Sequence, residues 1–214
     1  MSRESDRIDA RIDALRTDRL PATLVSSDGY HCEVWRCAGS VRRDGQRETR
    51  DFVIKVPRVP FTAAEVRVMR REHRRLRDAL GDIVPETLYV IAHIDGVESV
   101  VALAPTISRW FDIANPANEA EARPLLERMP RARAALCRFI EVAEAWYQSE
   151  ERVIDLYGLE NLVLDRNRHL HYIDSFGVFF HADVLNALPD PDPGLAERIE
   201  LSRRRLEYLR DLLV

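Results

Sequence analysis

The chain has 214 residues, of which 46% are hydrophobic and 32% are charged, and its formal net charge is −4. This composition is typical of one globular domain or two closely packed lobes, and the negative charge argues against a general nucleic-acid-binding protein. No stretch approaches the roughly 20 apolar residues that cross a bilayer, and the first residues lack the apolar segment of a signal peptide. We therefore expect a cytoplasmic protein.

The first half of the sequence alternates extended segments with two helices. Apolar residues at Ile8, Ile12 and Leu15 predict a short helix over residues 6–16. A second helix, over residues 62–80, begins at Thr62, whose hydroxyl can cap it. Short apolar runs predict strands at 23–26, 33–37, 51–56, 87–93 and 98–103, with an exposed hairpin loop at 39–50 and a tight turn at Asp95–Gly96.

The second half is predicted to be mainly helical, with Pro116 and Pro124 interrupting its first, irregular segment. One helix starts at Pro130 and runs to about residue 147, and a last amphipathic helix covers about 194–213. Between them, Leu162–Leu164 and Leu170–Ile173 flank a polar turn and predict a hairpin. The expected fold class is therefore α+β, and Leu103–Pro105 divides residues 1–104 from residues 105–214.

Lysine occurs only once in this sequence. Of the 32 basic residues, 31 are arginine, and the exception is Lys55. Arginine replaces lysine readily where only a surface charge is needed, but it does not replace a compact ammonium on a flexible stem. The lone lysine therefore indicates a role that arginine cannot fill, and its retention by chance is the alternative.

The order of the elements and the sequence DFVIKVPR on the third strand resemble the protein-kinase-like superfamily. The resemblance covers about residues 23–180, and it is closest to compact bacterial members, namely lipopolysaccharide-core kinases and small phosphotransferases related to aminoglycoside kinases. It implies a bilobal fold in which an antiparallel sheet with one key helix is followed by a reduced, mainly helical C-terminal lobe. It also implies ATP and Mg²⁺ as cofactors.

The resemblance assigns two charged residues of the N-terminal half to the nucleotide. Lys55 takes the place of the family lysine that contacts the α- and β-phosphates. Glu72 shares a helical stripe with Met69 and Leu76, and it is implied to orient Lys55. Glu65 is an alternative partner for the lysine, and exposure of Glu72 to solvent is a further alternative.

The remaining nucleotide-binding positions carry weaker signals. The glycine-rich loop of the family is reduced here to Gly29, five residues before Val34. Two of the three family glycines are replaced, so the geometry of this loop departs from the pattern. The resemblance also places Leu103 and Ala104, at the lobe boundary, beside the nucleotide.

Asp155, Asn161 and Asp174 carry the resemblance in the C-terminal half. Asn161 and Asp174 lie 13 residues apart on either side of the predicted hairpin, as in the family, and are implied Mg²⁺ ligands. Asp155 is implied to accept the proton of the acceptor hydroxyl, but it precedes Asn161 by six residues where the family has five. One residue must therefore bulge, near Gly158. The alternative is that the Asp and Asn side chains only stabilise turns.

Three functions are consistent with these patterns. The leading hypothesis is an ATP- and Mg²⁺-dependent phosphotransferase that acts on a hydroxyl of a small molecule, a saccharide or a protein. The second is a pseudokinase that serves as a regulatory or scaffolding module. The third is a polyanion-binding module that uses the six arginines of Arg67–Arg77. The histidines at positions 93, 169, 171 and 181 are not at metal-ligand spacing, and we expect them to be surface or strand residues.

Overall fold

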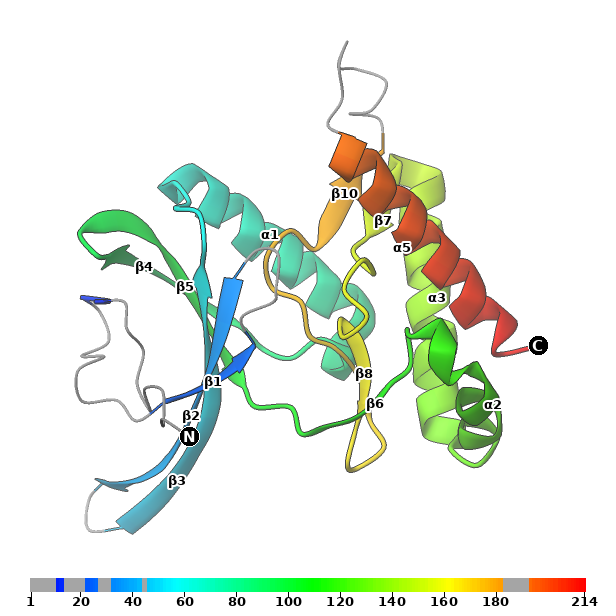
Figure 1. Cartoon of the computed structure of the whole chain (residues 1–214), viewed down its shortest axis with the longest axis horizontal. Coiled ribbons are helices and arrows are strands. Elements are labelled where there is room, and N and C mark those ends of the chain that lie inside the picture. Colours follow the sequence, from blue (N-terminus) through cyan, green and yellow to red (C-terminus); the bar gives the residue numbers. More distant parts are fainter. Residues whose placement is uncertain (1–10, 14–21, 27–31, 44–45, 183–192) are drawn as a thin grey trace, which may run out of the picture. The chain divides into compact units, whose positions relative to one another are not determined.

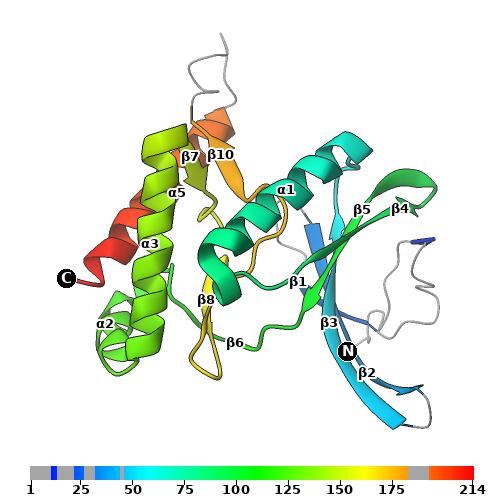
Figure 2. The same cartoon turned by 180° about the vertical axis from the view of Figure 1, so that it is seen from behind.

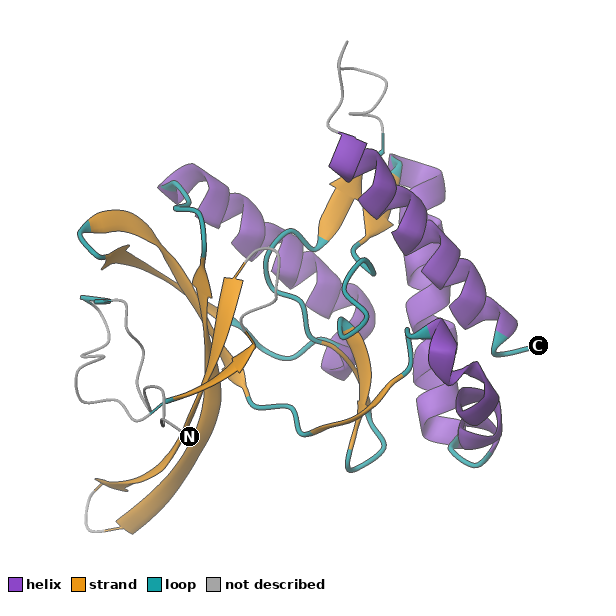
Figure 3. Cartoon of the chain, viewed as in Figure 1, coloured by secondary structure: helices purple, strands orange, loops and turns teal. Residues whose placement is uncertain are grey.

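The computed structural model describes residues 11–13, 22–26, 32–43, 46–182 and 193–214 (Figure 1). The chain divides into two units, one of Met1–His73 and Glu86–Thr106 and the other of Arg74–Pro85 and Ile107–Val214. Both units combine helices and strands (Figure 3), which confirms the α+β class. None of the described helices is long and apolar enough to span a membrane.

The first unit contains a five-stranded antiparallel sheet with the strand order β1-β2-β3-β5-β4. Its strands are β1 (Thr23–Ser26), β2 (Cys32–Arg43), β3 (Gln46–Pro57), β4 (Leu88–Ile94) and β5 (Val97–Pro105). All five predicted strands are present, but β2 and β3 pair through most of the stretch expected to be a loop, as far as Arg43 and Gln46. Backbone pairing needs no apolar side chains, so a polar sequence did not end these strands.

Helix α1 (Ala63–Leu80) begins at the predicted cap. Glu65 accepts hydrogen bonds from the backbone N–H and the hydroxyl of Thr62, each at 2.7 Å, and its own N–H donates to Thr62 Oγ1 at 3.3 Å. This is a capping box, which satisfies orphan backbone donors of the first turn. Farther along α1, the ring of His73 lies 5.7 Å from that of Tyr89 in β4, and Arg70 donates to the Tyr89 main-chain oxygen. The first part of α1 therefore covers the face of the sheet that carries Tyr89.

The helix predicted over residues 6–16 is wrong for residues 11–13, the part of it that the structure describes. Ile12 forms an antiparallel bridge with Ile94, and the N–H of Arg11 donates to Asp95 Oδ1 at 2.8 Å. The buried Ile12 side chain joins the apolar cluster of the first unit that surrounds Ile54. Residues 11–13 therefore contact the edge strand β4 and do not form the helix that their local sequence pattern predicts. Ile8, Leu15 and the rest of that prediction lie outside the described residues.

The second unit contains a three-stranded sheet of order β6-β8-β9 and a two-stranded sheet of β10 and β7. Its elements are η2 (Gly81–Ile83), β6 (Arg109–Asp112), η3 (Pro116–Asn118), α2 (Glu119–Glu127), α3 (Pro130–Glu150), β7 (Arg152–Ile154), β8 (Leu162–Asp165), β9 (Leu170–Tyr172), β10 (Phe179–His181) and α5 (Pro193–Asp211). The predicted hairpin and two long helices are confirmed. The sequence did not predict β6, β7, β10 or α2, because strands this short carry no clear period and Pro124 lies inside α2.

Helix α3 anchors both small sheets of the second unit. The ring of Phe139 lies 5.8 Å from that of Tyr172 in β9, and Trp146 meets Phe179 of β10 edge to face at 5.0 Å. Helix α5 runs beside α3, as Figure 2 shows from behind. The hairpin formed by β8 and β9 is therefore held against a large apolar core, which fixes the residues at its two ends.

Candidate functional site

Asp155, Asn161 and Asp174 come together in the second unit, at the open end of the β8–β9 hairpin. Asn161 directly precedes β8, and Asp174 follows β9 by two residues. The N–H of Ile173 donates to the Asn161 main-chain oxygen at 2.8 Å, which continues the strand pairing between these ends. Asn161 Nδ2 lies 3.1 Å from the Asp155 main-chain oxygen and 3.5 Å from Asp174 Oδ2. A separation of 13 residues in the sequence thus becomes a side-chain contact.

The carboxylate of Asp174 is oriented by the turn that follows it. Its Oδ1 accepts hydrogen bonds from the N–H groups of Ser175 and Phe176, at 2.6 and 3.2 Å. Gly177 has a φ of 67°, a conformation that glycine adopts far more readily than other residues. One carboxylate oxygen is therefore held by the backbone, and the other is directed towards Asn161.

Asp155 is the most strongly perturbed acid of the site. Only 4% of its surface is exposed, and its Oδ1 accepts a hydrogen bond from the N–H of Tyr157 at 2.7 Å. Burial, together with the negative charge of Asp174, raises the pKa of Asp155 to about 8, although the Tyr157 N–H and the positive charges of Arg198 and Arg205 oppose this. A carboxyl group with a pKa near neutrality can both accept and release a proton at physiological pH.

Helix α5 supports the loop that follows Asp155, which the sequence did not predict. The buried Ser202 accepts a hydrogen bond from the N–H of Leu156 at 3.1 Å. Arg205 donates to the main-chain oxygens of Leu156 and Tyr157. A serine and an arginine on an amphipathic helix form no recognisable motif, so no local signal could have identified these two residues.

Gly158 lies against the side chain of Asn161. The N–H of Asn161 donates to the Gly158 main-chain oxygen at 3.1 Å and closes a turn, which lies within the segment where the bulge was expected. A Cβ atom on residue 158 would lie 2.5 Å from Asn161 Oδ1 and 2.9 Å from its Cγ. Because contacts this short do not occur, any side chain at position 158 would displace the Asn161 amide.

If Asn161 is a metal ligand, as the resemblance implies, Gly158→Ala should weaken Mg²⁺-dependent ATP binding by roughly tenfold or more, the usual effect of disturbing a metal ligand through its neighbour. Calorimetric titration with ATP and Mg²⁺ measures this effect. Gly39→Ala is the matched control, because a Cβ atom on residue 39 meets nothing within 4 Å. Wild-type affinity in Gly158→Ala would show that the position of Asn161 does not matter for binding.

In the first unit, Lys55 lies in the middle of the sheet. It pairs with Val34 of β2 and with Ala102 of β5, and it is buried, with 8% of its surface exposed. Directly opposite residues in an antiparallel sheet share a face, and so do alternate residues of one strand. Val34, Lys55 and Ala104 therefore share one face. Leu103 lies on the other face, against the apolar cluster of the first unit, so its side chain is not placed with Lys55.

Glu72 is half-buried on the part of α1 that covers the Lys55 face. The neighbouring His73 contacts Tyr89, which pairs with Ala102 and therefore belongs to that same face. Glu72 therefore lies on the helix turn that packs against the sheet face carrying Lys55. The pairing of Glu72 with Lys55 that the resemblance implies stays a prediction.

Glu65 and Gly29 are the remaining residues of the first unit that the sequence suggested for nucleotide binding. The carboxylate of Glu65 is engaged in the capping box, where the backbone N–H and the hydroxyl of Thr62 lower the pKa of Glu65. Glu65 therefore has a structural role at the start of α1, which leaves Glu72 as the candidate partner of the lysine. Gly29 lies outside the described residues.

The arginines of α1 are partly engaged within the protein. Arg75 binds both carboxylate oxygens of Glu150, and Arg77 donates to the Val84 main-chain oxygen at 2.6 Å. Arg70 is bound to a main-chain oxygen of β4, as described above. Three of the six arginines thus have partners within the chain, which leaves a smaller basic surface than the sequence suggested.

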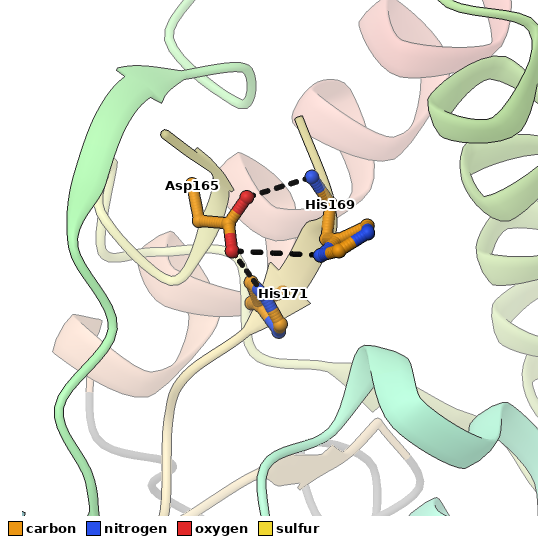
Figure 4. A group of neighbouring side chains, drawn as sticks. All are labelled: Asp165, His169 and His171. Carbon is orange, nitrogen blue, oxygen red and sulfur yellow. Dashed lines mark hydrogen bonds and ion pairs between the residues drawn. The ribbon is translucent and has the colours of Figure 1, made fainter. Parts of the chain in front are cut away.

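A second group of possible ligands lies at the closed end of the hairpin. Asp165, His169 and His171 each offer one ligand atom, and these atoms all lie within 4.8 Å of one another (Figure 4). His169 is exposed and His171 lies in β9, as expected of surface and strand residues, yet both ring systems approach Asp165. Their spacing from Asp165 in the sequence does not indicate this group, because the three side chains meet only through the register of the hairpin.

The side-chain oxygens of Asn161 and Asp174 form a donor set suited to a hard cation such as Mg²⁺. Because Asn161 donates through Nδ2 to the Asp155 main chain, its Oδ1 is left without a hydrogen-bond partner among the described residues and can serve as a ligand. No protein-family model matches the chain, and no curated protein sequence matches it either. The function must therefore be inferred from these side chains and their surroundings.

Proposed function

We propose that this chain is an ATP- and Mg²⁺-dependent phosphotransferase of the kinase-like fold, with a reduced second lobe. The convergence of Asp155, Asn161 and Asp174 carries the proposal. It combines two oxygen ligands for a hard cation with a nearby carboxyl group whose pKa is raised towards neutrality. The five-stranded antiparallel sheet with one covering helix is compatible with the N-terminal lobe of such an enzyme.

The proposal gives Asp155, Asn161 and Asp174 distinct roles. Asp174 and Asn161 hold Mg²⁺, which neutralises phosphate charge when it is bound. Asp155 accepts the proton of the acceptor hydroxyl. A positive charge beside Asp174 counteracts the effect of the Asp174 carboxylate on the pKa of Asp155. Metal binding therefore lowers the pKa of Asp155 and favours its ionised, proton-accepting form.

Lys55 is assigned to the α- and β-phosphates, and we expect Lys55→Arg to weaken ATP binding roughly tenfold although the charge is kept. The side chain is buried in the sheet, and the wide, planar guanidinium cannot occupy the space of an ammonium. Calorimetric titration with ATP and Mg²⁺ measures the change. Arg71→Lys, a change of the same kind on the exposed surface of α1, is the control. Equal affinity in Lys55→Arg and wild type would show that Lys55 does not bind the phosphates.

Nucleotide binding is the direct test of the proposed function. The full chain is titrated with ATP in the presence of Mg²⁺ and again in the presence of a chelator. We expect saturable binding that depends on Mg²⁺, followed by ADP formation when a hydroxyl acceptor is supplied. Absence of nucleotide binding in both titrations would contradict the proposal.

A nucleotide-binding regulatory module is the second candidate, and the burial of Asp155 favours it. A proton acceptor must reach its substrate, whereas Asp155 is 4% exposed and one of its oxygens is already bound to the backbone. This candidate predicts Mg²⁺-dependent ATP binding without turnover. Binding and turnover measured on the same preparation therefore distinguish the two functions.

A further inference from the structure

The closed end of the β8–β9 hairpin gathers three side chains of metal-binding chemistry from a short stretch of sequence. Asp165 ends β8, His169 lies in the turn, and His171 is the middle residue of β9. Asp165 Oδ2 lies 3.3 Å from His171 Nε2 and 3.7 Å from His169 Nδ1 (Figure 4). This group is at the opposite end of the hairpin from Asn161 and Asp174, so it is separate from the site described above.

The hairpin register explains why these three residues meet. Leu164 pairs with Leu170, and the N–H of Asp165 donates to the His169 main-chain oxygen at 2.9 Å, which makes residues 165 and 169 opposite neighbours. Alternate strand residues share a face, so His171 lies on the same side as His169. Arg168, with a φ of 69°, completes the turn. The arrangement is thus built by the backbone, before any ion is present.

The distances between the ligand atoms suit a transition-metal ion. Tetrahedral Zn²⁺ with imidazole and carboxylate ligands at about 2.0–2.1 Å places neighbouring ligand atoms about 3.4 Å apart. The observed 3.3 and 3.7 Å are close to that value, and the three ligand atoms all lie within 4.8 Å of one another. Two imidazoles and one carboxylate favour a transition metal over Mg²⁺, which prefers oxygen ligands.

The orientation of the individual groups agrees with binding through these atoms. Asp165 Oδ1 accepts the N–H of His169 at 2.8 Å, so Oδ2 is the oxygen directed at the imidazoles. His171 Nδ1 is buried without a hydrogen-bond partner among the described residues, so Nε2 is the nitrogen through which that ring can bind. His169 is largely exposed, which gives an ion in solution access to the group.

Charges around the group leave the carboxylate available. Arg109, which pairs with Asp165 across β6 and β8, is bound to Glu160 and lies 3.7 Å from Asp112. Its positive charge is therefore offset by two other carboxylates. The arginines at positions 166 and 168 are exposed, so solvent and salt screen them.

We propose that Asp165, His169 and His171 bind one Zn²⁺ ion through Oδ2, Nδ1 and Nε2, with water completing the coordination. The ion closes the tip of the hairpin whose base carries Asn161 and Asp174. It is held by the second unit alone and does not depend on the binding of ATP or Mg²⁺.

The test uses the full chain without a histidine tag, stripped of metal and then titrated with Zn²⁺ and, separately, with Co²⁺. We expect one equivalent of Zn²⁺ to bind with a dissociation constant of about 1 μM or tighter. Bound Co²⁺ should show the intense visible absorption of a four- or five-coordinate site. An excess of Mg²⁺ should not displace either ion.

Ligand variants show where the ion binds. His169→Ala and His171→Ala should each lower the Zn²⁺ affinity by at least roughly a hundredfold. The loss of a residue that only hydrogen-bonds to a metal ligand already costs roughly 10–100-fold. His169 is exposed, so its removal leaves the fold intact and keeps the test decisive even if His171→Ala is unstable.

The matched control is His93→Ala, which removes a separate Asp–His pair, where His93 Nδ1 lies 2.8 Å from Asp13 Oδ2. This variant should bind Zn²⁺ like the wild type. Absence of saturable Zn²⁺ binding in the wild type would overturn the proposal. Unchanged affinity in His169→Ala would overturn it as well, because the three residues would then only form an Asp–His ion-pair group at the turn.

Discussion

Asp174→Asn should lower the affinity for ATP in the presence of Mg²⁺ by roughly a hundredfold, to the affinity that the wild type shows in a chelator. Asparagine has the same shape, and its Oδ1 can still accept the N–H groups of Ser175 and Phe176, so the turn is preserved. The substitution removes the negative charge, which a dication bound at this position requires, and it replaces the oxygen that faces Asn161 by an amide nitrogen. Calorimetric titrations with and without Mg²⁺ measure the loss.

Asp112→Asn is the control for Asp174→Asn. Asp112 is another partly exposed carboxylate of the second unit, at the end of β6, and it lies outside the candidate site. Its neutralisation should leave ATP binding unchanged, while circular dichroism confirms that both variants are folded. If Asp174→Asn kept the wild-type response to Mg²⁺, Asp174 would be a structural turn residue, and the proposed metal site would be wrong.

The proximity of Asn161 and Asp174 in the candidate site follows from local sequence pattern. The apolar runs on both sides of residues 165–168 specify a hairpin, and strand pairing then brings its ends together. Asn161 and Asp174 flank these runs, so their contact follows from the hairpin alone. Lys55 stands out by composition alone, as the one lysine among 32 basic residues, and β-branched neighbours mark its strand, while its role stays a prediction.

The features that the sequence could not predict depend on contacts between distant segments. Ile12 occupies a helical pattern, yet it bridges β4, some 80 residues away. Ser202 supports the Asp155 loop from the last helix. The raised pKa of Asp155 also has no local sequence signal, because burial by the whole second unit is its largest cause. His169 and His171 meet Asp165 only in one hairpin register, since a shift by one residue would reverse the faces.

A change in stability with pH provides an independent measure of Asp155. The folded protein raises the pKa of Asp155 to about 8, above the value of about 3.9 for an unfolded chain. The folded state therefore binds this proton more tightly. The resulting stability is fully present below the unfolded pKa and is lost as the pH rises through 8. Asparagine does not titrate. Without Mg²⁺, the melting temperature of Asp155→Asn relative to that of the wild type should therefore be higher at pH 8 than at pH 5, by roughly 5 °C or more.

The same variant separates the enzyme from the regulatory module. Asp155→Asn should bind ATP and Mg²⁺ like the wild type, because Asn161 hydrogen-bonds to the main-chain oxygen of residue 155 and Tyr157 can donate to the new amide oxygen. If Asp155 accepts the proton of the acceptor hydroxyl, turnover should fall by roughly a hundredfold or more, since an amide cannot take up that proton. ADP formation with a hydroxyl acceptor is measured for both proteins under saturating ATP. Equal turnover in the two proteins would show that Asp155 is not the proton acceptor. Intact Mg²⁺-dependent ATP binding without turnover, in wild type and variant alike, would establish the chain as a nucleotide-binding regulatory module, in which the buried acid only shapes the loop before Asn161.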